Sequence, residues 1–167
     1  CASFGSDAEA AIEKLKDVCI SIHCWQGDDV VGFDSRQAAS GGIQTTGNYP
    51  GKARNFKELT ADLDEALKYI PGKKKLNLHA IYQTGKVVDR RDITSKQFAE
   101  WVNYAKKRHL GLDMNPTLFS SPMLVNGLSL SSPDKKVRDY WIKHCINSIK
   151  VTEYFGKQLH QKALCNI

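Results

Sequence analysis

Side chains that could do acid–base chemistry or bind hydroxyl groups recur at alternate positions of three short apolar runs. In the first run, His23 and Trp25 fall on the same side. His79 does so in the second run, and Asp113 and Asn115 do so in the third. Because alternate residues of a strand share a face, these groups would form one polar surface if the strands are neighbours. A sugar is the ligand that such a surface favours, since rings supply apolar faces and Asn, Asp and His bind hydroxyls. A single histidine is more often structural, and that alternative stays open.

Other catalytic patterns find less support. Asp28 and Asp29 are adjacent, so on an extended chain they face opposite ways and favour a solvated acidic turn over a shared proton or metal. The remaining histidines, His109, His144 and His160, fall on or near predicted helices and are expected to be surface or packing residues. The sequence contains no glycine-rich phosphate-binding motif of the GxGxxG or GxxxxGK[ST] type.

Hydrophobic periodicity predicts four helices that would position these runs. They cover 7–18, 56–70, a segment that begins at Thr94 with a capping box, and a last helix from the N-cap Ser132 to Gly156. In the last helix, apolar residues recur every four positions up to Ile149, and Ile142 and Ile146 widen the stripe.

The predicted strands are 19–25, 76–82, 110–115 and 163–167. Alternating strands and helices indicate βαβ units and a parallel sheet in an α/β fold. One face of each strand is apolar and the other gathers polar residues at its carboxyl end, which favours a (β/α)8 barrel of the TIM-barrel type over a doubly wound sheet. A complete barrel takes about 250 residues. We therefore expect 1–167 to be the N-terminal segment of a single (β/α) barrel domain, with only its first three to four βα units.

The connection 26–54 is long for a βα loop and holds half of the chain's 12 glycines. Such a loop is expected to be functional, with a set of turns held by Asp, Asn and Gly as the alternative.

Charge and cysteine content exclude several classes. The net charge of +6 is concentrated between Lys52 and Arg91. Lys73–Lys75 follow a predicted helix and lack interleaved aromatics, so they are expected to be solvated in a turn and do not favour nucleic-acid binding. Five cysteines without a CxxC pair are typical of reduced, mostly buried cytosolic thiols and not of a zinc site. No apolar run is long enough for a membrane span, and no secretory signal peptide is expected.

Five separated motifs carry a resemblance to a known family. They are Ser21–Val30 (SIHCWQGDDV), Thr46–Ala53 (TGNYPGKA), Leu76–Tyr82 (LNLHAIY), Gly111–Phe119 (GLDMNPTLF) and Tyr154–Gly156 (YFG). In this order they resemble the L-rhamnose isomerase family, over essentially the whole chain. The chain corresponds to about the first two fifths of such an enzyme.

The resemblance implies a cytoplasmic, homotetrameric (β/α)8 barrel enzyme that interconverts L-rhamnose and L-rhamnulose. It also implies manganese or a similar divalent metal, which polarises the carbonyl and orients the open-chain sugar while a hydride moves between C1 and C2. The family's metal ligands lie on later strands, so no metal ligand and no catalytic residue is expected in this segment.

The expected substrate-binding residues are Trp25, Val30, His79, Ile81, Tyr82 and Asn115. The motifs imply that Val30, Ile81 and Tyr82 help form the apolar pocket for the C6 methyl group of the sugar. The other three are assigned mainly from their parity in the barrel strands.

Two departures from the family pattern are Ser121, where His is more common after Phe-Ser, and Ala39, where a larger apolar residue is common. The leading hypothesis is an isomerase segment that supplies pocket residues and is inactive alone. The alternative is a non-catalytic sugar-binding or barrel-completing module. Exposed sheet edges predict that the segment aggregates, dimerises or needs the rest of the barrel.

Overall fold

The structure is a computed structural model that describes residues 4–5, 7–23, 32–33 and 53–167. Its helices are α1 (Ala8–Leu15), α3 (Phe56–Leu67), α4 (Ala99–Arg108) and α5 (Lys135–Leu159). The strands are β1 (Ile20–His23), β2 (Lys74–His79) and β3 (Gly111–Asn115). Two 3-10 helices, η2 (Arg90–Asp92) and η3 (Ser95–Phe98), lie between β2 and α4.

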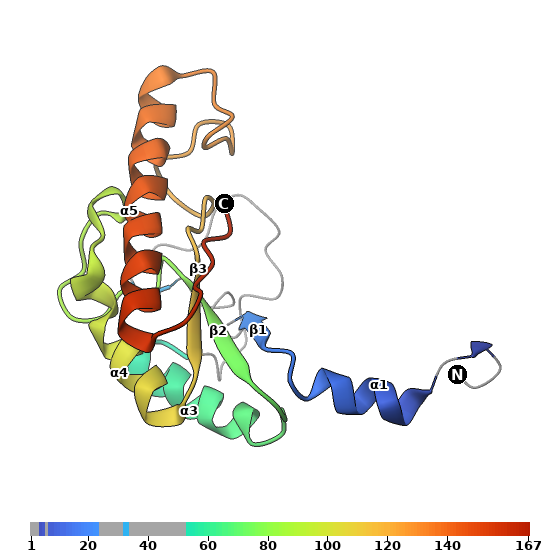
Figure 1. Cartoon of the computed structure of the whole chain (residues 1–167). Coiled ribbons are helices and arrows are strands. Elements are labelled where there is room, and N and C mark those ends of the chain that lie inside the picture. Colours follow the sequence, from blue (N-terminus) through green and yellow to red (C-terminus); the bar gives the residue numbers. More distant parts are fainter. Residues whose placement is uncertain (1–3, 6, 24–31, 34–52) are drawn as a thin grey trace.

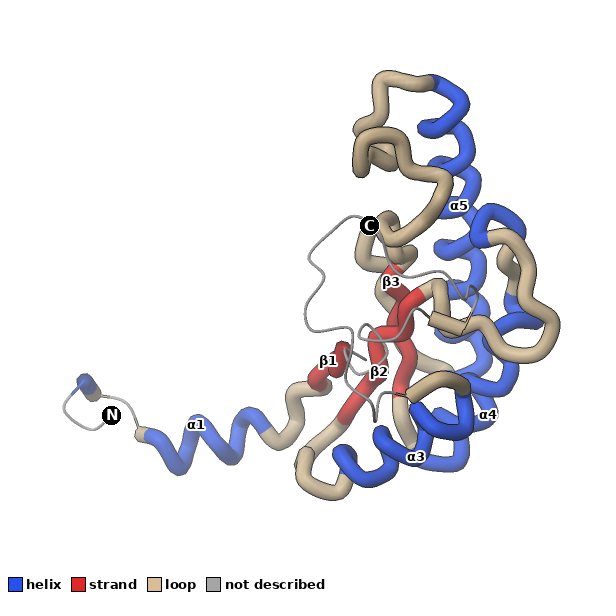
Figure 2. Tube along the Cα trace, turned by 180° about the vertical axis from the view of Figure 1, so that it is seen from behind, coloured by secondary structure: helices blue, strands red, loops and turns tan. Residues whose placement is uncertain are grey.

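The strands form a parallel sheet in the order β1-β2-β3, so each strand pairs with the next in sequence. Helices α3, α4 and α5 lie together on one side of this sheet (Figures 1 and 2). The predicted α/β class and the parallel pairing are therefore confirmed. Among the described residues, no helix is long and apolar enough to cross a membrane.

The core fills the space between the sheet and these helices. Leu76 and Leu78 of β2 and Leu112 and Met114 of β3 are fully buried there, as the alternation of apolar residues predicts. The helical side of the same cluster is supplied mainly by Leu59, Leu63, Trp101, Val102, Ala105, Val151 and Phe155. The polar residues of the strands lie on the opposite face of the sheet, away from the core.

The segment predicted as a fourth strand, 163–167, lies along the free edge of β3. Cys165 forms an isolated parallel bridge with Met114, whose N–H donates to Leu164 O at 2.8 Å and whose O accepts from Asn166 N at 2.8 Å. The location and direction are as predicted, although the pairing is a single bridge and not a full strand.

Helix α5 differs from its prediction at both ends. Asp134, not Ser132, is the N-cap, and its side chain accepts from Lys136 N. Gly156 does not end the helix, which continues to Leu159 and closes with His160 in the left-handed region at φ 51°. Gly156 has a packing role instead, because a Cβ there would lie 3.0 Å from Gln161 O.

The buried face of α5 also differs from the predicted stripe. Ile142, Ile146 and Ile149 are about half exposed, at 48%, 47% and 49%. The buried positions are Val137, Tyr140, Trp141, His144, Cys145, Ser148, Val151, Thr152 and Phe155. An α-helix has 3.6 residues per turn, so positions spaced strictly by four move gradually around the helix away from one face. The buried face of α5 therefore follows alternating steps of three and four, and it includes polar residues.

Strand β2 begins earlier than predicted, and this changes the environment of the lysines. Lys74 and Lys75 are its first residues, whereas Ala80, Ile81 and Tyr82 follow it. The expectation of three solvated lysines is wrong for Lys75, whose side chain is only 15% exposed. Residues at odd positions of β2 face away from the helices, so this lysine lies on the polar face.

Two other expectations concern α1 and the cysteines. The helix predicted over 7–18 is α1, which Asp7 caps and which ends at Leu15; it contains no buried residue and extends away from the sheet (Figure 1). Cys145 is buried and Cys165 half-buried, whereas Cys19 is exposed. Burial raises the pKa of the Cys145 and Cys165 thiols, which keeps them protonated at neutral pH.

Candidate functional site

The carboxyl ends of β2 and β3 bring two of the predicted substrate-binding residues side by side. His79 is the last residue of β2 and pairs in register with Asn115, the last residue of β3. Thr117 joins them: its Oγ1 lies 3.2 Å from His79 Nδ1, and its N–H donates to Asn115 Oδ1 at 2.7 Å. Thr117 has a φ of 58°, a region that a β-branched residue rarely adopts. The chain thus holds a strained residue at the place where polar groups converge.

His79 is buried, at 1% exposure, between aromatic rings. Its ring centroid lies 5.5 Å from that of Tyr82 and 6.2 Å from that of Phe119. Burial, with a smaller contribution from the nearby positive groups His23 and Arg90, lowers the pKa of His79 to about 4. The imidazole is therefore neutral at pH 7 and can exchange hydrogen bonds with a hydroxyl without carrying charge.

Ile81 and Tyr82 follow β2 and are buried, at 3% and 0% exposure. Gly32 and Phe33 lie directly on them: Phe33 N donates to Ile81 O at 2.7 Å, and the rings of Phe33 and Tyr82 are 5.3 Å apart. A Cβ on Gly32 would come within 2.6 Å of Ile81 Cβ, so glycine permits this close approach. Ile81 and Tyr82 therefore form an apolar wall beside His79.

Further along the same face, the amide of Asn77 faces β1. Its Nδ2 lies 3.3 Å from His23 Nε2 and 3.4 Å from His23 Nδ1. Its Oδ1 is buried and has no hydrogen-bond partner among the described residues. This oxygen is an acceptor on the polar face that a ligand or a further part of the protein could satisfy.

Asp113 of β3 pairs in register with Asn77 and connects several strands. Its Oδ1 is 3.3 Å from Lys75 Nζ and accepts from Leu164 N at 2.8 Å, and its Oδ2 accepts from Ser21 Oγ at 2.7 Å. The carboxylate is therefore engaged with β1, β2 and the edge segment. It is a structural link and not a free acid or base.

Two buried residues fix the loops that follow β2 and β3. The Arg90 guanidinium donates to Thr117 O at 3.1 Å, Phe119 O at 2.8 Å and Ser120 O at 2.7 Å. His144 of α5 lies between Arg90 O, 2.6 Å from its Nδ1, and the O of Pro116, 2.5 Å from its Nε2. The two loops are thereby held to each other and to α5.

The described residues do not form a metal site. No cluster of three or more His, Cys, Asp or Glu side chains with metal-binding geometry occurs within the described ranges. The donor chemistry agrees, since Asp113 is the carboxylate on the polar face and its oxygens already bind Lys75 Nζ, Ser21 Oγ and a backbone N–H.

The structure therefore brings together some of the substrate-binding residues that were predicted from the sequence. His79, Ile81, Tyr82 and Asn115 gather at the carboxyl ends of β2 and β3. Trp25, Val30, the Asp28–Asp29 pair and most of the loop 26–54 lie outside the described residues.

Three residues at this end of the sheet have contacts that were not predicted from the sequence: Arg90, Thr117 and His144. Arg90 stands in the charged run Asp89–Asp92, which is typical of a solvated surface, and yet it is 7% exposed. For Thr117, the only local feature in the sequence that could have indicated its role is its position directly after Pro116. His109 and His160, in contrast, are exposed as expected.

Comparison with known proteins identifies the family to which the chain is similar. The sequence profile of the L-rhamnose isomerase (RhaA) family matches residues 1–167. The L-rhamnose isomerase of Salmonella gallinarum is 52% identical over 168 residues, which cover 99% of this chain and 40% of that protein. The L-rhamnose isomerase of Cronobacter sakazakii gives the same identity and coverage. The chain thus spans 40% of the length of these relatives.

A three-stranded parallel sheet with helices on one side (Figure 1) defines an α/β protein. The match over the whole chain is more specific. The chain belongs to the L-rhamnose isomerase family.

Proposed function

We propose that the whole protein is an aldose–ketose isomerase that interconverts L-rhamnose and L-rhamnulose, and that this chain supplies part of its sugar pocket. The observation that carries the proposal is the family match over all 167 residues. The convergence of His79, Asn115 and the apolar wall of Ile81 and Tyr82 supports it, because a 6-deoxy sugar presents both hydroxyls and a methyl group.

In the proposed pocket, His79 and Asn115 bind hydroxyl groups, while Ile81 and Tyr82 pack near the C6 methyl group. Val30 is proposed for the same apolar group on the family resemblance of its motif. Trp25 is proposed to offer an aromatic face to the sugar ring. A buried neutral imidazole is suited to the role proposed for His79, because it orients a hydroxyl without competing for protons at pH 7.

The complete fold, the metal ion and the oligomeric state are proposed from membership of the family. The parallel strands are proposed to be the beginning of a (β/α)8 barrel that the rest of the protein closes. Manganese or a similar divalent ion is proposed to bind to ligands elsewhere in the protein. A cytoplasmic homotetramer is the proposed form of the enzyme.

A complementation assay tests the proposal. The purified 167-residue chain is mixed with the remaining part of the Salmonella gallinarum relative, and L-rhamnulose formation is measured with manganese and after EDTA. We expect no turnover from the chain alone and EDTA-sensitive turnover from the mixture. Turnover from the chain alone would contradict the assignment of the metal ligands to other parts of the protein.

The second candidate, a sugar-binding or barrel-completing module without catalysis, is favoured by the engaged state of Asp113. It predicts that the chain alone binds L-rhamnose in EDTA and that the mixture has no isomerase activity. Calorimetry with L-rhamnose, run beside the assay, distinguishes the two.

A further inference from the structure

The hydroxyl group of Thr117 lies where three hydrogen-bonding groups meet at the carboxyl ends of β2 and β3. Its Oγ1 accepts from Ala80 N at 3.1 Å, lies 3.2 Å from Asn115 O and lies 3.2 Å from His79 Nδ1. Thr117 is fully buried, so bulk water does not compete for this hydroxyl. The three contacts must therefore be compatible with the hydrogen atom and the lone pairs of one hydroxyl group.

A hydroxyl group has one hydrogen atom to donate and two lone pairs that accept. The N–H of Ala80 takes one lone pair. If the hydrogen atom points at Asn115 O, the second lone pair faces His79 Nδ1, which must then carry a proton. If the hydroxyl instead donates to His79 Nδ1, the two oxygen atoms lie 3.2 Å apart with no hydrogen atom between them. Only the first arrangement makes all three contacts hydrogen bonds.

A proton on Nδ1 determines what the other nitrogen atom of the His79 ring can do. Burial lowers the pKa of His79 to about 4, so the ring is neutral at pH 7. A neutral imidazole carries one proton, and a proton on Nδ1 leaves a lone pair on Nε2. Nε2 is then a hydrogen-bond acceptor, to which a hydroxyl group can donate.

The surroundings hold this arrangement in place. Thr117 has a φ of 58°, which glycine adopts at less cost, but glycine has no hydroxyl group. The Arg90 guanidinium binds the same residue, since it donates to Thr117 O at 3.1 Å. The rings of Tyr82 and Phe119, at 5.5 and 6.2 Å from the His79 ring, restrict rotation of the imidazole. The position therefore retains a threonine against the local backbone preference.

We propose that Thr117 is a positioning residue that fixes His79 in the Nδ1–H tautomer, so that His79 Nε2 accepts a hydrogen bond from a hydroxyl group of the sugar. This role rests on the sugar pocket proposed above. Asn115 has the opposite polarity: its Oδ1 accepts from Thr117 N at 2.7 Å, so its amide presents the donor Nδ2 on the other side. Hydroxyl groups, which both donate and accept, match this pair of neighbours.

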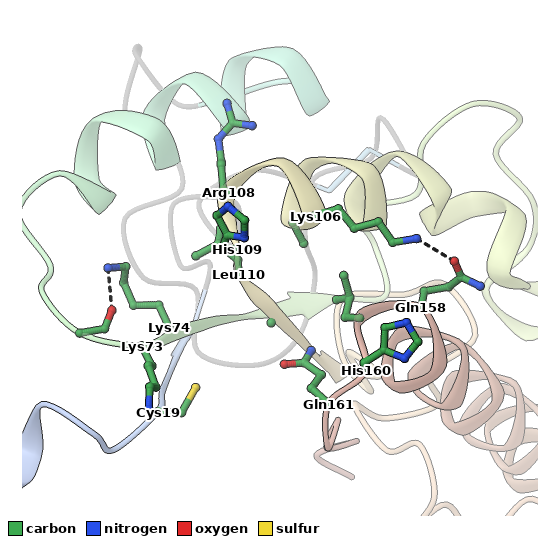
Figure 3. Close-up of a pocket in the computed structure, with 14 residues that line it drawn as sticks. Cys19, Lys73, Lys74, Lys106, Arg108, His109, Leu110, Gln158, His160 and Gln161 are labelled. Carbon is green, nitrogen blue, oxygen red and sulfur yellow. Dashed lines mark hydrogen bonds between the residues drawn. The ribbon is translucent and has the colours of Figure 1, made fainter.

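Nitrogen NMR of the whole enzyme with isotope-labelled histidine tests the tautomer, because a ring nitrogen with a proton resonates far from one with a lone pair. The signals of His79 are assigned by their loss in His79→Gln. We expect Nδ1–H in the sugar-free enzyme and a shift of the Nε2 signal when L-rhamnose is added with magnesium, a diamagnetic ion. His109 and His160 are internal controls, since they line an open cavity at the amino ends of the strands (Figure 3). Their signals should not respond to the sugar.

Thr117→Val removes the hydroxyl group and keeps the branched shape of the side chain. We expect a mixture of His79 tautomers and a KM for L-rhamnose about tenfold higher, as for loss of one hydrogen bond, with kcat within about twofold of the parent. Thr117→Ser keeps the hydroxyl group and should restore both the tautomer and KM. Because the tautomer is also measured in the parent enzyme, the proposal is tested even if Thr117→Val fails to fold.

Thr84→Val is the matched control. Thr84 is also buried, and its Oγ1 donates to Gln97 O at 3.0 Å, a contact that does not involve His79. Its KM should stay within about twofold of the parent, and the tautomer of His79 should be unchanged.

An Nε2–H signal for His79 in the parent enzyme would overturn the proposal. An unchanged tautomer in Thr117→Val, or equal changes of KM in Thr117→Val and Thr84→Val, would also overturn it. If the tautomer is as expected but L-rhamnose does not move the Nε2 signal, the sugar pocket itself is contradicted, and with it the acceptor role of Nε2. The two kinds of failure are therefore distinguishable.

Discussion

Lys75 of β2 and Asp113 of β3 form an ion pair on the polar face of the sheet, with Nζ and Oδ1 3.3 Å apart and side chains 15% and 1% exposed. The same carboxylate accepts from Ser21 Oγ and from Leu164 N, so one side chain connects β1, β2, β3 and the edge segment. The ammonium group also donates to Lys162 O. This pair thus links neighbouring strands on the polar face of the sheet, beneath the proposed sugar pocket.

Removal of one partner from the Lys75–Asp113 pair should lower the stability of the folded protein. Asp113→Leu leaves the Lys75 ammonium without its counter-charge and should lower the free energy of unfolding by about 3 kcal/mol. The double variant Lys75→Met/Asp113→Leu should recover part of the loss, since the unpaired charge is then gone. Urea unfolding of the whole protein measures both values.

The exposed pair of Lys73 and Asp17 is the control, with side chains 67% and 87% exposed. Lys73→Met should change the unfolding free energy by less than about 1 kcal/mol. A loss in Lys73→Met as large as that in Asp113→Leu would contradict the role given to the buried pair.

The buried His79 predicts a dependence of stability on pH. Its pKa is about 4 in the folded protein, against an ordinary value of 6.5. Between these values the unfolded chain binds the additional proton, so the unfolding free energy falls as the pH is lowered from 6.5 to 4. The contribution over this window is about 3 kcal/mol.

Urea unfolding at pH 7.0, 5.5 and 4.5 checks this contribution. We expect a shallower pH dependence in His79→Gln than in the parent. The exposed His160 gives the matched variant His160→Gln, whose pH dependence should follow the parent. Parallel curves for all three proteins would show that His79 titrates normally.

His144 should stabilise the loops at the carboxyl ends of the strands. His144→Phe keeps a ring but leaves the O atoms of Arg90 and Pro116 without this partner, and we expect a loss of about 2–4 kcal/mol. Asn147, also on α5, donates to Arg91 O at 2.8 Å from an exposed position. Asn147→Ala should therefore cost less than about 1 kcal/mol, and comparable losses in the two variants would argue against a special role for His144.

The apolar wall predicts sugar specificity. If Ile81 packs near the C6 methyl group, Ile81→Thr should lower the ratio of kcat/KM for L-rhamnose to that for L-mannose, which carries a hydroxyl at C6. One methyl group in an apolar pocket is worth roughly 10- to 200-fold. Because both sugars are assayed on one preparation, the ratio is independent of the fraction of folded enzyme. An unchanged ratio would place the methyl group elsewhere.

The alternation of residues along β2 and β3 was enough to predict which face is polar. Leu76 and Leu78 are in the core, and Asn77 and His79 are opposite, because a period of two admits few alternatives when one face is buried. The residues at which helices begin and end were harder to predict than the faces of the strands. Ser132 and Asp134 are both good N-cap residues, and only the packing of α5 decides between them.

Arg90 and the bridging role of His144 could not be predicted from the sequence. Their partners are backbone carbonyls 27 to 54 residues away, and any residue type supplies a carbonyl. A charged run and a histidine on a helix therefore have no local pattern that indicates burial. The same holds for Lys75, whose neighbours Lys73 and Lys74 suggest a solvated turn.

The three carbonyls that Arg90 binds all belong to the segment 117–120, at the carboxyl end of β3. A loop held by one rigid, planar group at three points loses its conformational entropy when the protein folds. A ligand that arrives later at Asn115 and His79 then meets a wall already in its final shape, and its affinity is not reduced by the ordering of that loop.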